Sequence, residues 1–168
     1  MRVFSIQHDR QGLPEVERTS ACVDDVAARL ISLPEVNGVV VLSTCNRVEV
    51  ILDTTGEASN SILRVALNSS FDPPPAWDLY LGEAALGHVF RVAAGLDSMV
   101  VGEREIAGQL RRALAAAQEA GVASLPLNLA VDEALRTSRR IARETALESA
   151  GRSVVSVGLD LMGVEDWT

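Results

Sequence analysis

The sequence predicts an α+β fold in which a ferredoxin-like, split βαβ antiparallel sheet is followed by a helical subdomain. Up to Gly82, strand and helix patterns alternate as β-α-β-β-α-β, the order of the split βαβ arrangement, with helices on one face of the sheet. Beyond Gly82, the chain shows only the spacing of amphipathic helices. Its 168 residues, 48% hydrophobic and 23% charged, suit one folded domain or two small subdomains with a shared core.

The first half is expected to contain four strands and two helices. Alternating or β-branched apolar residues predict strands at residues 2–7, 36–42, 47–52 and 77–81. Helical spacing covers residues 19–33, where Pro34 ends the helix, and residues 57–69. In the third strand, one face carries Val48, Val50 and Leu52, and the other carries Arg47, Glu49 and Ile51.

The second half is expected to be helical throughout. Helices are predicted at residues 83–96, 103–120 and 127–146 and from 153 onward, with Gly95, Gly102 and Gly121 between them. The chain therefore divides into an α/β subdomain at residues 1–82 and a helical subdomain at residues 83–152.

Composition narrows the class of function. The net charge of −8 argues against a general nucleic-acid binder, although it leaves room for a local basic site. All 15 basic residues are arginine, which excludes a lysine Schiff base.

We expect no signal peptide and no membrane association, because no apolar stretch approaches the roughly 20 residues of a membrane-spanning helix. Two cysteines are too few for a disulfide framework, so a reducing cytoplasm is the expected location.

Cys45 is the strongest candidate for a nucleophile. It lies at the tight connection between the second and third strands, where a turn exposes side chains and frees backbone N–H groups. The nearby Arg47 favours the thiolate, which is the nucleophilic form of cysteine. A lone cysteine is more often buried as a small apolar side chain, but the polar neighbours of Cys45 count against that role. Cys22, on a predicted helix, is assigned that structural role.

His88 is the candidate acid–base partner of Cys45. It lies on the predicted helix at residues 83–96, outside the apolar stripe of Leu86, Phe90 and Ala93. A histidine on a helix face is more often simply solvated. The sequence alone does not place His88 beside Cys45.

Two further segments carry polar side chains at suggestive spacings. Residues 95–109 could present Ser98, Glu103 and Gln109 to a small polar ligand, although an ordinary helix connection explains them equally well. A basic stripe on the predicted helix at residues 127–146 can hold RNA phosphates, and the alternative is a solvated face paired with glutamates. The stripe consists of Arg136, Arg139, Arg140 and Arg143, with Arg111 and Arg112 as possible additions.

Neither a dinucleotide motif nor a metal motif is found. The chain has no Gly-x-Gly-x-x-Gly spacing after a strand, so we expect no Rossmann-type dinucleotide site within it. The two cysteines and two histidines lack the spacing of metal ligands, so we expect no metal.

Two long motifs resemble those of glutamyl-tRNA reductases. Residues 43–50 are STCNRVEV, which resembles the active-site motif of that family, and residues 88–103 are HVFRVAAGLDSMVVGE, which resembles a second motif. Shorter similarities lie at residues 143–145 (RET) and 153–156 (SVVS). The resemblance covers nearly the whole chain and implies the same ferredoxin-like sheet with helices.

The resemblance also implies a chemistry. In the family, a cysteine thiolate attacks the ester carbonyl of glutamyl-tRNA, and NADPH reduces the resulting thioester to glutamate-1-semialdehyde for tetrapyrrole biosynthesis. By position, Cys45 would be the nucleophile and His88 the histidine near it. The ester is already activated, so an exposed thiolate and oriented donors suffice for thioester formation. The implied substrate-binding residues are Thr44, Asn46, Arg47, Ser98, Glu103, Arg104, Glu105 and Gln109, among which Arg47 suits a carboxylate.

The sequence departs from the family at two places. Residues 7–9 are QHD where the family usually has Asn-His-Lys, and Arg104-Glu105 follows Glu103 where the family has Pro-Gln. An acid in place of that glutamine would repel a substrate carboxylate unless Arg104 compensates. Residues 153–168 match the start of the family's connecting helix, without its NADPH-binding and dimerisation domains. We therefore expect a monomer or a weak dimer.

Three functions are compatible with these observations. The motifs favour the catalytic domain of an NADPH-dependent reductase. The altered pocket and the missing cofactor domain favour a stand-alone enzyme that passes a thioester-bound aminoacyl group to another nucleophile. A non-catalytic tRNA-binding module is disfavoured by the presence of both Cys45 and His88.

Overall fold

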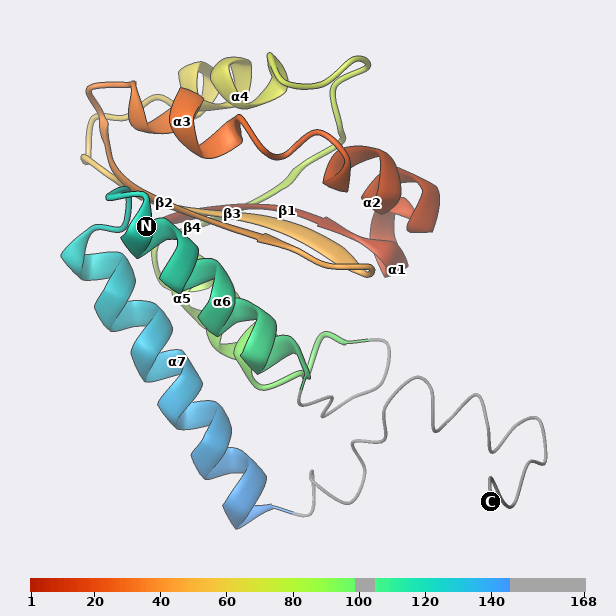
Figure 1. Ribbon diagram of the computed structural model, residues 1–168, viewed down its shortest axis with the longest axis vertical. Coiled ribbons are helices and arrows are strands. Elements are labelled where there is room, and N and C mark those ends of the chain that lie inside the picture. Colours follow the sequence, from red (N-terminus) through yellow and green to blue (C-terminus); the bar gives the residue numbers. More distant parts are fainter. Residues whose placement is uncertain (99–104, 146–168) are drawn as a thin grey trace.

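The structure is a computed structural model that describes residues 1–98 and 105–145 (Figure 1). The strands are β1 (Arg2–Gln7), β2 (Val36–Ser43), β3 (Arg47–Thr54) and β4 (Asp78–Leu81). The helices of the described residues are α1 (His8–Gln11), α2 (Leu13–Ser20), α3 (Val26–Ile31), α4 (Asn60–Asn68), α5 (Gly82–Ala93), α6 (Glu105–Glu119) and α7 (Leu125–Glu144).

The four strands form one antiparallel sheet in the order β2-β3-β1-β4. This is the strand order of the split βαβ arrangement, so the predicted ferredoxin-like α+β fold is confirmed. The first strand in sequence lies inside the sheet, where Gln7 pairs with Arg47 of β3 and Arg2 pairs with Leu81 of β4. The β2–β3 hairpin therefore ends beside the end of β1.

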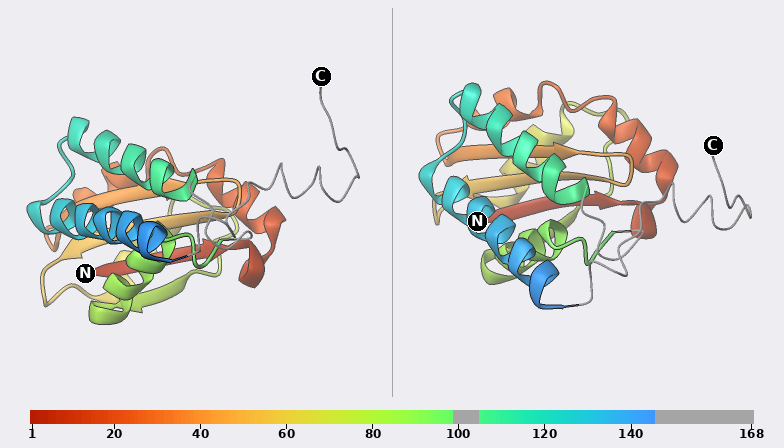
Figure 2. Two further views of the ribbon diagram at one scale, coloured as in Figure 1. Left: turned by 90° about the horizontal axis from the view of Figure 1, so that it is seen from below. Right: turned by 60° about the horizontal axis from the view of Figure 1, so that its bottom comes forward.

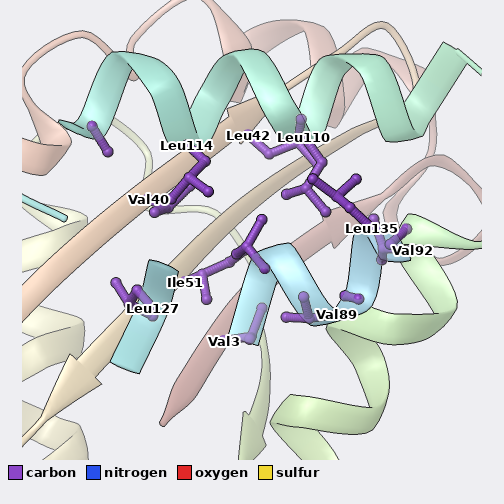
Figure 3. Close-up of a cluster of buried hydrophobic side chains, with 14 of the residues drawn as sticks. Val3, Val40, Leu42, Ile51, Val89, Val92, Leu110, Leu114, Leu127 and Leu135 are labelled. Atoms are coloured by element: carbon purple, nitrogen blue, oxygen red, sulfur yellow. The ribbon is translucent and has the colours of Figure 1, made fainter. Parts of the chain in front are cut away.

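Helices cover both faces of the sheet (Figure 1). On one face, apolar residues of α2, α3 and α4 pack against Phe4, Val48 and Val50 of the strands. On the other face, α5, α6 and α7 pack against the strands around Val3, Val40, Leu42 and Ile51 (Figure 3). The helices α3 and α4, which lie between strands in the chain, are on one face of the sheet as expected. The sheet as a whole is covered on both faces, because α5, α6 and α7 pack on the second face. Burying both faces removes apolar surface from water on each side of β3.

The predicted helix at residues 19–33 is wrong as a single element. In the structure, α2 ends at Ser20 and α3 begins at Val26, with turns between them. Asp24 and Asp25 fall in this interruption, and aspartate side chains favour turns by competing for backbone hydrogen bonds. The expected burial of Cys22 is also wrong, because that thiol is exposed in the same turn.

The bounds of α6 and α7 were predicted within about two residues, and α5 ends three residues before the predicted end at residue 96. α6 and α7 correspond to the helices expected at residues 103–120 and 127–146, and the helix expected from residue 153 lies outside the described residues. The connection between α6 and α7 is fixed to the start of β2, where Val39 donates its N–H to the carbonyl of Val122 at 2.9 Å. No helix of the described part of the chain is long and apolar enough to cross a membrane.

Candidate active site

Cys45 lies in the tight turn that joins β2 to β3, at one end of the sheet. The N–H of Thr44 donates to the carbonyl of Arg47 at 2.9 Å, and the Thr44 hydroxyl accepts from the N–H groups of Asn46 and Arg47, both at 3.2 Å. The side chain of Cys45 is exposed, and its own N–H has no hydrogen-bond partner within the described residues. The turn thus presents a thiol and a free amide donor on one residue.

Two short helices hold this turn in place. The N–H of His8, at the start of α1, donates to the carbonyl of Asn46 at 3.0 Å. The hydroxyl of Ser20, at the end of α2, contacts the hydroxyl of Ser43. These contacts tie the turn to the segment that follows β1, so the position of Cys45 is set by long-range contacts as well as by the hairpin.

Arg47 and Glu49 form a buried ion pair beneath the turn. The Nη1 atom of Arg47 lies 3.3 Å from Oε1 of Glu49, and each side chain is only 2% exposed. The Nη2 atom of Arg47 donates to the backbone carbonyl of Asp97, which brings the segment after α5 next to the turn. Both terminal nitrogens of Arg47 are therefore engaged by groups of the protein itself.

His88 is buried, so the interpretation of a solvated histidine is wrong. Its side chain is 1% exposed, its Nε2 atom lies 3.0 Å from Oε2 of Glu49, and its ring stacks on Tyr80 with 4.1 Å between ring centroids. The helix face that carries His88 packs against the sheet, which the stripe of Leu86 and Phe90 did not predict. Within the described residues, no hydrogen bond joins His88 to Cys45. The histidine is connected to the turn through Glu49 and Arg47.

Asp97 faces the second nitrogen of His88. Oδ1 of Asp97 accepts from Arg91 Nη2 at 2.9 Å and Nε at 3.2 Å. Its Oδ2 atom lies 3.8 Å from Nδ1 of His88, and both of these atoms are buried without a hydrogen-bond partner in the described structure. Glu49 accepts from Arg47 with Oε1, and a hydrogen bond from His88 to its Oε2 requires a ring proton on Nε2.

The structure describes some of the predicted substrate-binding residues and not others. Ser98 is half-buried and follows Asp97, whose carbonyl is bonded to Arg47. Glu105 is exposed at the first position of α6, and Gln109 lies one turn later and is half-buried. Glu103 and Arg104 lie outside the described residues. Ser98 is thus brought beside the cysteine turn through its neighbour.

Sequence reasoning did not assign a role to Glu49, Asp97 or Tyr80. A signal for Glu49 was present, because Arg47 and Glu49 are two residues apart on a strand and so share one face. Two opposite charges on the same face of an otherwise apolar strand indicate a buried pair. The contribution of Tyr80 depends on strand β4 packing against α5, and no local pattern predicts it.

The arrangement is suited to attack by a thiol on an electrophilic carbon. Cys45 is exposed, the free N–H beside it can donate to an oxygen that gains negative charge, and a buried Arg–Glu–His network fixes the strand below. Among the described residues, no group of three or more His, Cys, Asp or Glu side chains is placed to hold a metal ion. Fold and site define a ferredoxin-like domain with an exposed cysteine at a hairpin turn.

The chain belongs to the family described as Glutamyl-tRNAGlu reductase, N-terminal domain, which matches residues 4–145. It is 46% identical over 171 residues to the glutamyl-tRNA reductase of Micrococcus luteus, covering 96% of this chain and 38% of that protein. It is 42% identical over 166 residues to the glutamyl-tRNA reductase of Cutibacterium acnes, covering 95% of this chain and 37% of that protein.

A solved structure shares the fold. The glutamyl-tRNA reductase from Methanopyrus kandleri matches with a TM-score of 0.68 at 28% sequence identity, over 86% of this chain and 34% of that chain. The resemblance inferred from residues 43–50 and 88–103 is therefore confirmed. The chain spans little more than a third of the length of these relatives.

Proposed function

We propose that this chain is the thioester-forming part of an NADPH-dependent glutamyl-tRNA reductase. The observation that carries this proposal is the exposed thiol of Cys45, at a hairpin turn within the span that matches the family. The relatives are named glutamyl-tRNA reductases, which supports glutamyl-tRNA as the substrate. We propose a cytoplasmic location, because a reducing compartment keeps the exposed thiols of Cys45 and Cys22 free.

In the proposed step, the Sγ atom of Cys45, as thiolate, attacks the ester carbonyl carbon of glutamyl-tRNA. A carbon–sulfur bond forms, the bond from that carbon to the ribose oxygen breaks, and the leaving ribose oxygen takes up a proton. The free N–H of Cys45 is the candidate donor to the carbonyl oxygen while it carries negative charge. The hydroxyl of Thr44 supports this geometry from within the turn, by accepting from the N–H groups of Asn46 and Arg47.

His88 and Arg47 act from below the turn in this proposal. Their polar atoms are directed to Glu49 and Asp97. The two side chains therefore position the hairpin, and the charged groups beneath the turn are those of Arg47 and Glu49. Polar contacts to the glutamyl group are assigned instead to Asn46, Ser98, Glu105 and Gln109 and to Glu103 and Arg104.

The residues of this chain do not fit the reduced dinucleotide. A Rossmann site needs a glycine-rich turn between a parallel strand and a helix, whereas the sheet here is antiparallel and the chain has no such motif. We therefore assign hydride transfer to the part of the relatives beyond the matched span and derive no step through NADPH. The alternative of a stand-alone acyl transferase gains no support from these relatives, which are named glutamyl-tRNA reductases.

The proposal is tested by trapping the thioester. The chain is mixed with glutamyl-tRNA carrying radiolabelled glutamate and is precipitated in acid, and the protein-bound label is then exposed to hydroxylamine, which cleaves thioesters. We expect a hydroxylamine-sensitive adduct with the unchanged chain and with Cys22→Ser, and none with Cys45→Ser. Cys22 is the matched control because it is the other exposed thiol.

Two results would count against the proposal. A label that persists in Cys45→Ser would place the acyl group elsewhere. Absence of any adduct from glutamyl-tRNA would remove glutamate as the substrate, and the same assay with other aminoacyl-tRNAs would then separate an altered specificity from a chain that forms no thioester.

A further inference from the structure

A cleft between the ends of α6 and α7 is lined by arginines. Its volume is about 420 Å³, and its lining includes Arg111 from α6 and Ser138, Arg139 and Arg143 from α7. The remaining lining residues are small, among them Gly108 and Ala142, so no side chain of residues 1–98 or 105–145 fills the space between the guanidinium groups. Among the described residues, none that lines the cleft is acidic.

The charges of this cleft are not compensated by the described part of the protein. Arg136, one turn before Arg139 on α7, is paired with Glu133 at 3.4 Å. By contrast, Arg111, Arg139 and Arg143 form no ion pair with any described residue, although the whole chain carries a net charge of −8. Three cations around one hollow, with a serine hydroxyl beside them, favour an anion with several oxygen acceptors, such as a phosphate group.

The cleft lies at the same end of the sheet as Cys45. The α6–α7 connection is attached to the start of β2, where the N–H of Val39 bonds to Val122 and Gly38 lies against Ser124. Both helices extend from that connection along the sheet, so their other ends, which line the cleft, lie toward the end of β2. Figure 2 (right) shows these two helix ends and the β2–β3 hairpin on the side opposite the connection.

We propose that this arginine cleft binds backbone phosphate of the tRNA whose aminoacyl end is presented to Cys45. The inference rests on the proposed function, because that function requires a bound tRNA. A phosphodiester backbone provides anionic oxygens at regular intervals, and the exposed Arg140 on the same helix can meet a neighbouring phosphate. The cleft supplies affinity, whereas Cys45 supplies the chemistry.

The test measures binding of uncharged tRNA for glutamate, which involves no acyl transfer. Fluorescence anisotropy gives Kd over a series of salt concentrations for the 168-residue chain. In the cleft variant, Arg139→Gln is combined with Arg143→Gln. In the matched control, Arg18→Gln is combined with Arg29→Gln, which removes two ion-paired arginines of the α2–α3 segment, outside the cleft and outside the basic stripe of α7.

We expect the cleft variant to raise Kd at least tenfold at about 150 mM salt and to reduce the slope of log K against log salt by about 1 to 2. The control should stay within about twofold of the unchanged chain. A third variant, Arg139→Lys combined with Arg143→Lys, should retain the salt slope, because charge rather than shape produces that slope. Circular dichroism verifies that each variant is folded.

Equal Kd values for the cleft variant and the control would overturn the inference, as would a chain that does not bind tRNA. The two experiments together distinguish an error in the proposed cleft from an error in the proposed function. A labelled Cys45 adduct together with unaltered tRNA binding in the cleft variant rejects the cleft and keeps the function. Binding that depends on the cleft, without any adduct, keeps the cleft and rejects the function.

Discussion

Arg47 and Glu49 are charged side chains on a strand that is buried on both faces. Each is almost completely buried, and removing a charge from water costs several kcal/mol unless an opposite charge and hydrogen bonds compensate. Here Glu49 accepts from Arg47 with one oxygen and meets His88 with the other. The three residues therefore depend on one another, and the strand that begins at the cysteine turn depends on all of them.

Removing the charge of Glu49 tests this dependence. Glu49→Gln preserves the shape of the side chain but leaves the buried Arg47 without its counter-charge, so we expect the free energy of unfolding to fall by about 3 kcal/mol. The measurement is urea denaturation followed by circular dichroism. The combination of Glu49→Gln with Arg47→Met should cost less than the sum of the two single changes, because the buried charge is then absent. Additive losses would show that the pair is not coupled.

At this scale the sequence predicts which residue is exposed at a turn better than it predicts which polar side chains are buried. Cys45 could be singled out because polar residues surround it within a short connection, which is a local property. The burial of His88 and Arg47 could not, because it is caused by α5 packing on the sheet and by Asp97, which lies 50 residues from Arg47 in the chain. The ion pair was visible only as two opposite charges on one face of a strand.

At the scale of elements, the strands were predicted closely because β-branched residues and strict alternation coincide with them. The predicted span of residues 36–42 compares with Val36–Ser43 in the structure, and 47–52 compares with Arg47–Thr54. The prediction of one helix at residues 19–33 was wrong because the apolar spacing continues across the turn at residues 21–25. Val26 and Leu30 do face the core, but they belong to a second helix. Periodicity alone does not distinguish one helix from two that share a face.

The attachment of α7 to the sheet depends on a glycine. A Cβ atom at Gly38 would lie 2.7 Å from both the backbone nitrogen and the hydroxyl oxygen of Ser124, the N-cap of α7. Gly38→Ala should therefore move the α6–α7 connection away from β2 and lower the free energy of unfolding by about 1 to 3 kcal/mol. Thermal and urea denaturation measure the change.

Gly87→Ala is the matched control for that substitution. Gly87 is exposed within α5, and nothing lies within 4 Å of a Cβ atom built on it. Alanine in a helix interior is favoured over glycine, so this change should raise the free energy of unfolding by about 0.5 to 1 kcal/mol. If Gly38→Ala is also neutral or stabilising, the close approach of β2 and α7 is not tight enough to fix the connection.

At the scale of the whole molecule, two apolar clusters share the same four-stranded sheet. The cluster around Phe4 and Val50 packs with α2 to α4, and the cluster around Val3 and Ile51 packs with α5 to α7. Neighbouring residues of one strand thus belong to different clusters, since successive side chains point to opposite faces. Loss of either helix layer would expose one face of every strand. The division into subdomains at residues 1–82 and 83–152 therefore describes a change in sequence pattern. Whether the two parts fold independently of each other can be measured.

We predict that the two layers unfold together. Trp77 is buried among Phe4 and Phe71 on the α2–α4 side, so after Trp167→Phe its fluorescence reports on that layer alone. Far-UV circular dichroism is dominated by the long helices α6 and α7 on the other side. Because both layers bury the same strands, the two signals should give one urea midpoint and one slope. Separate midpoints, with the helical signal lost first, would show that the helices fold as an independent unit on a sheet that stays intact without them.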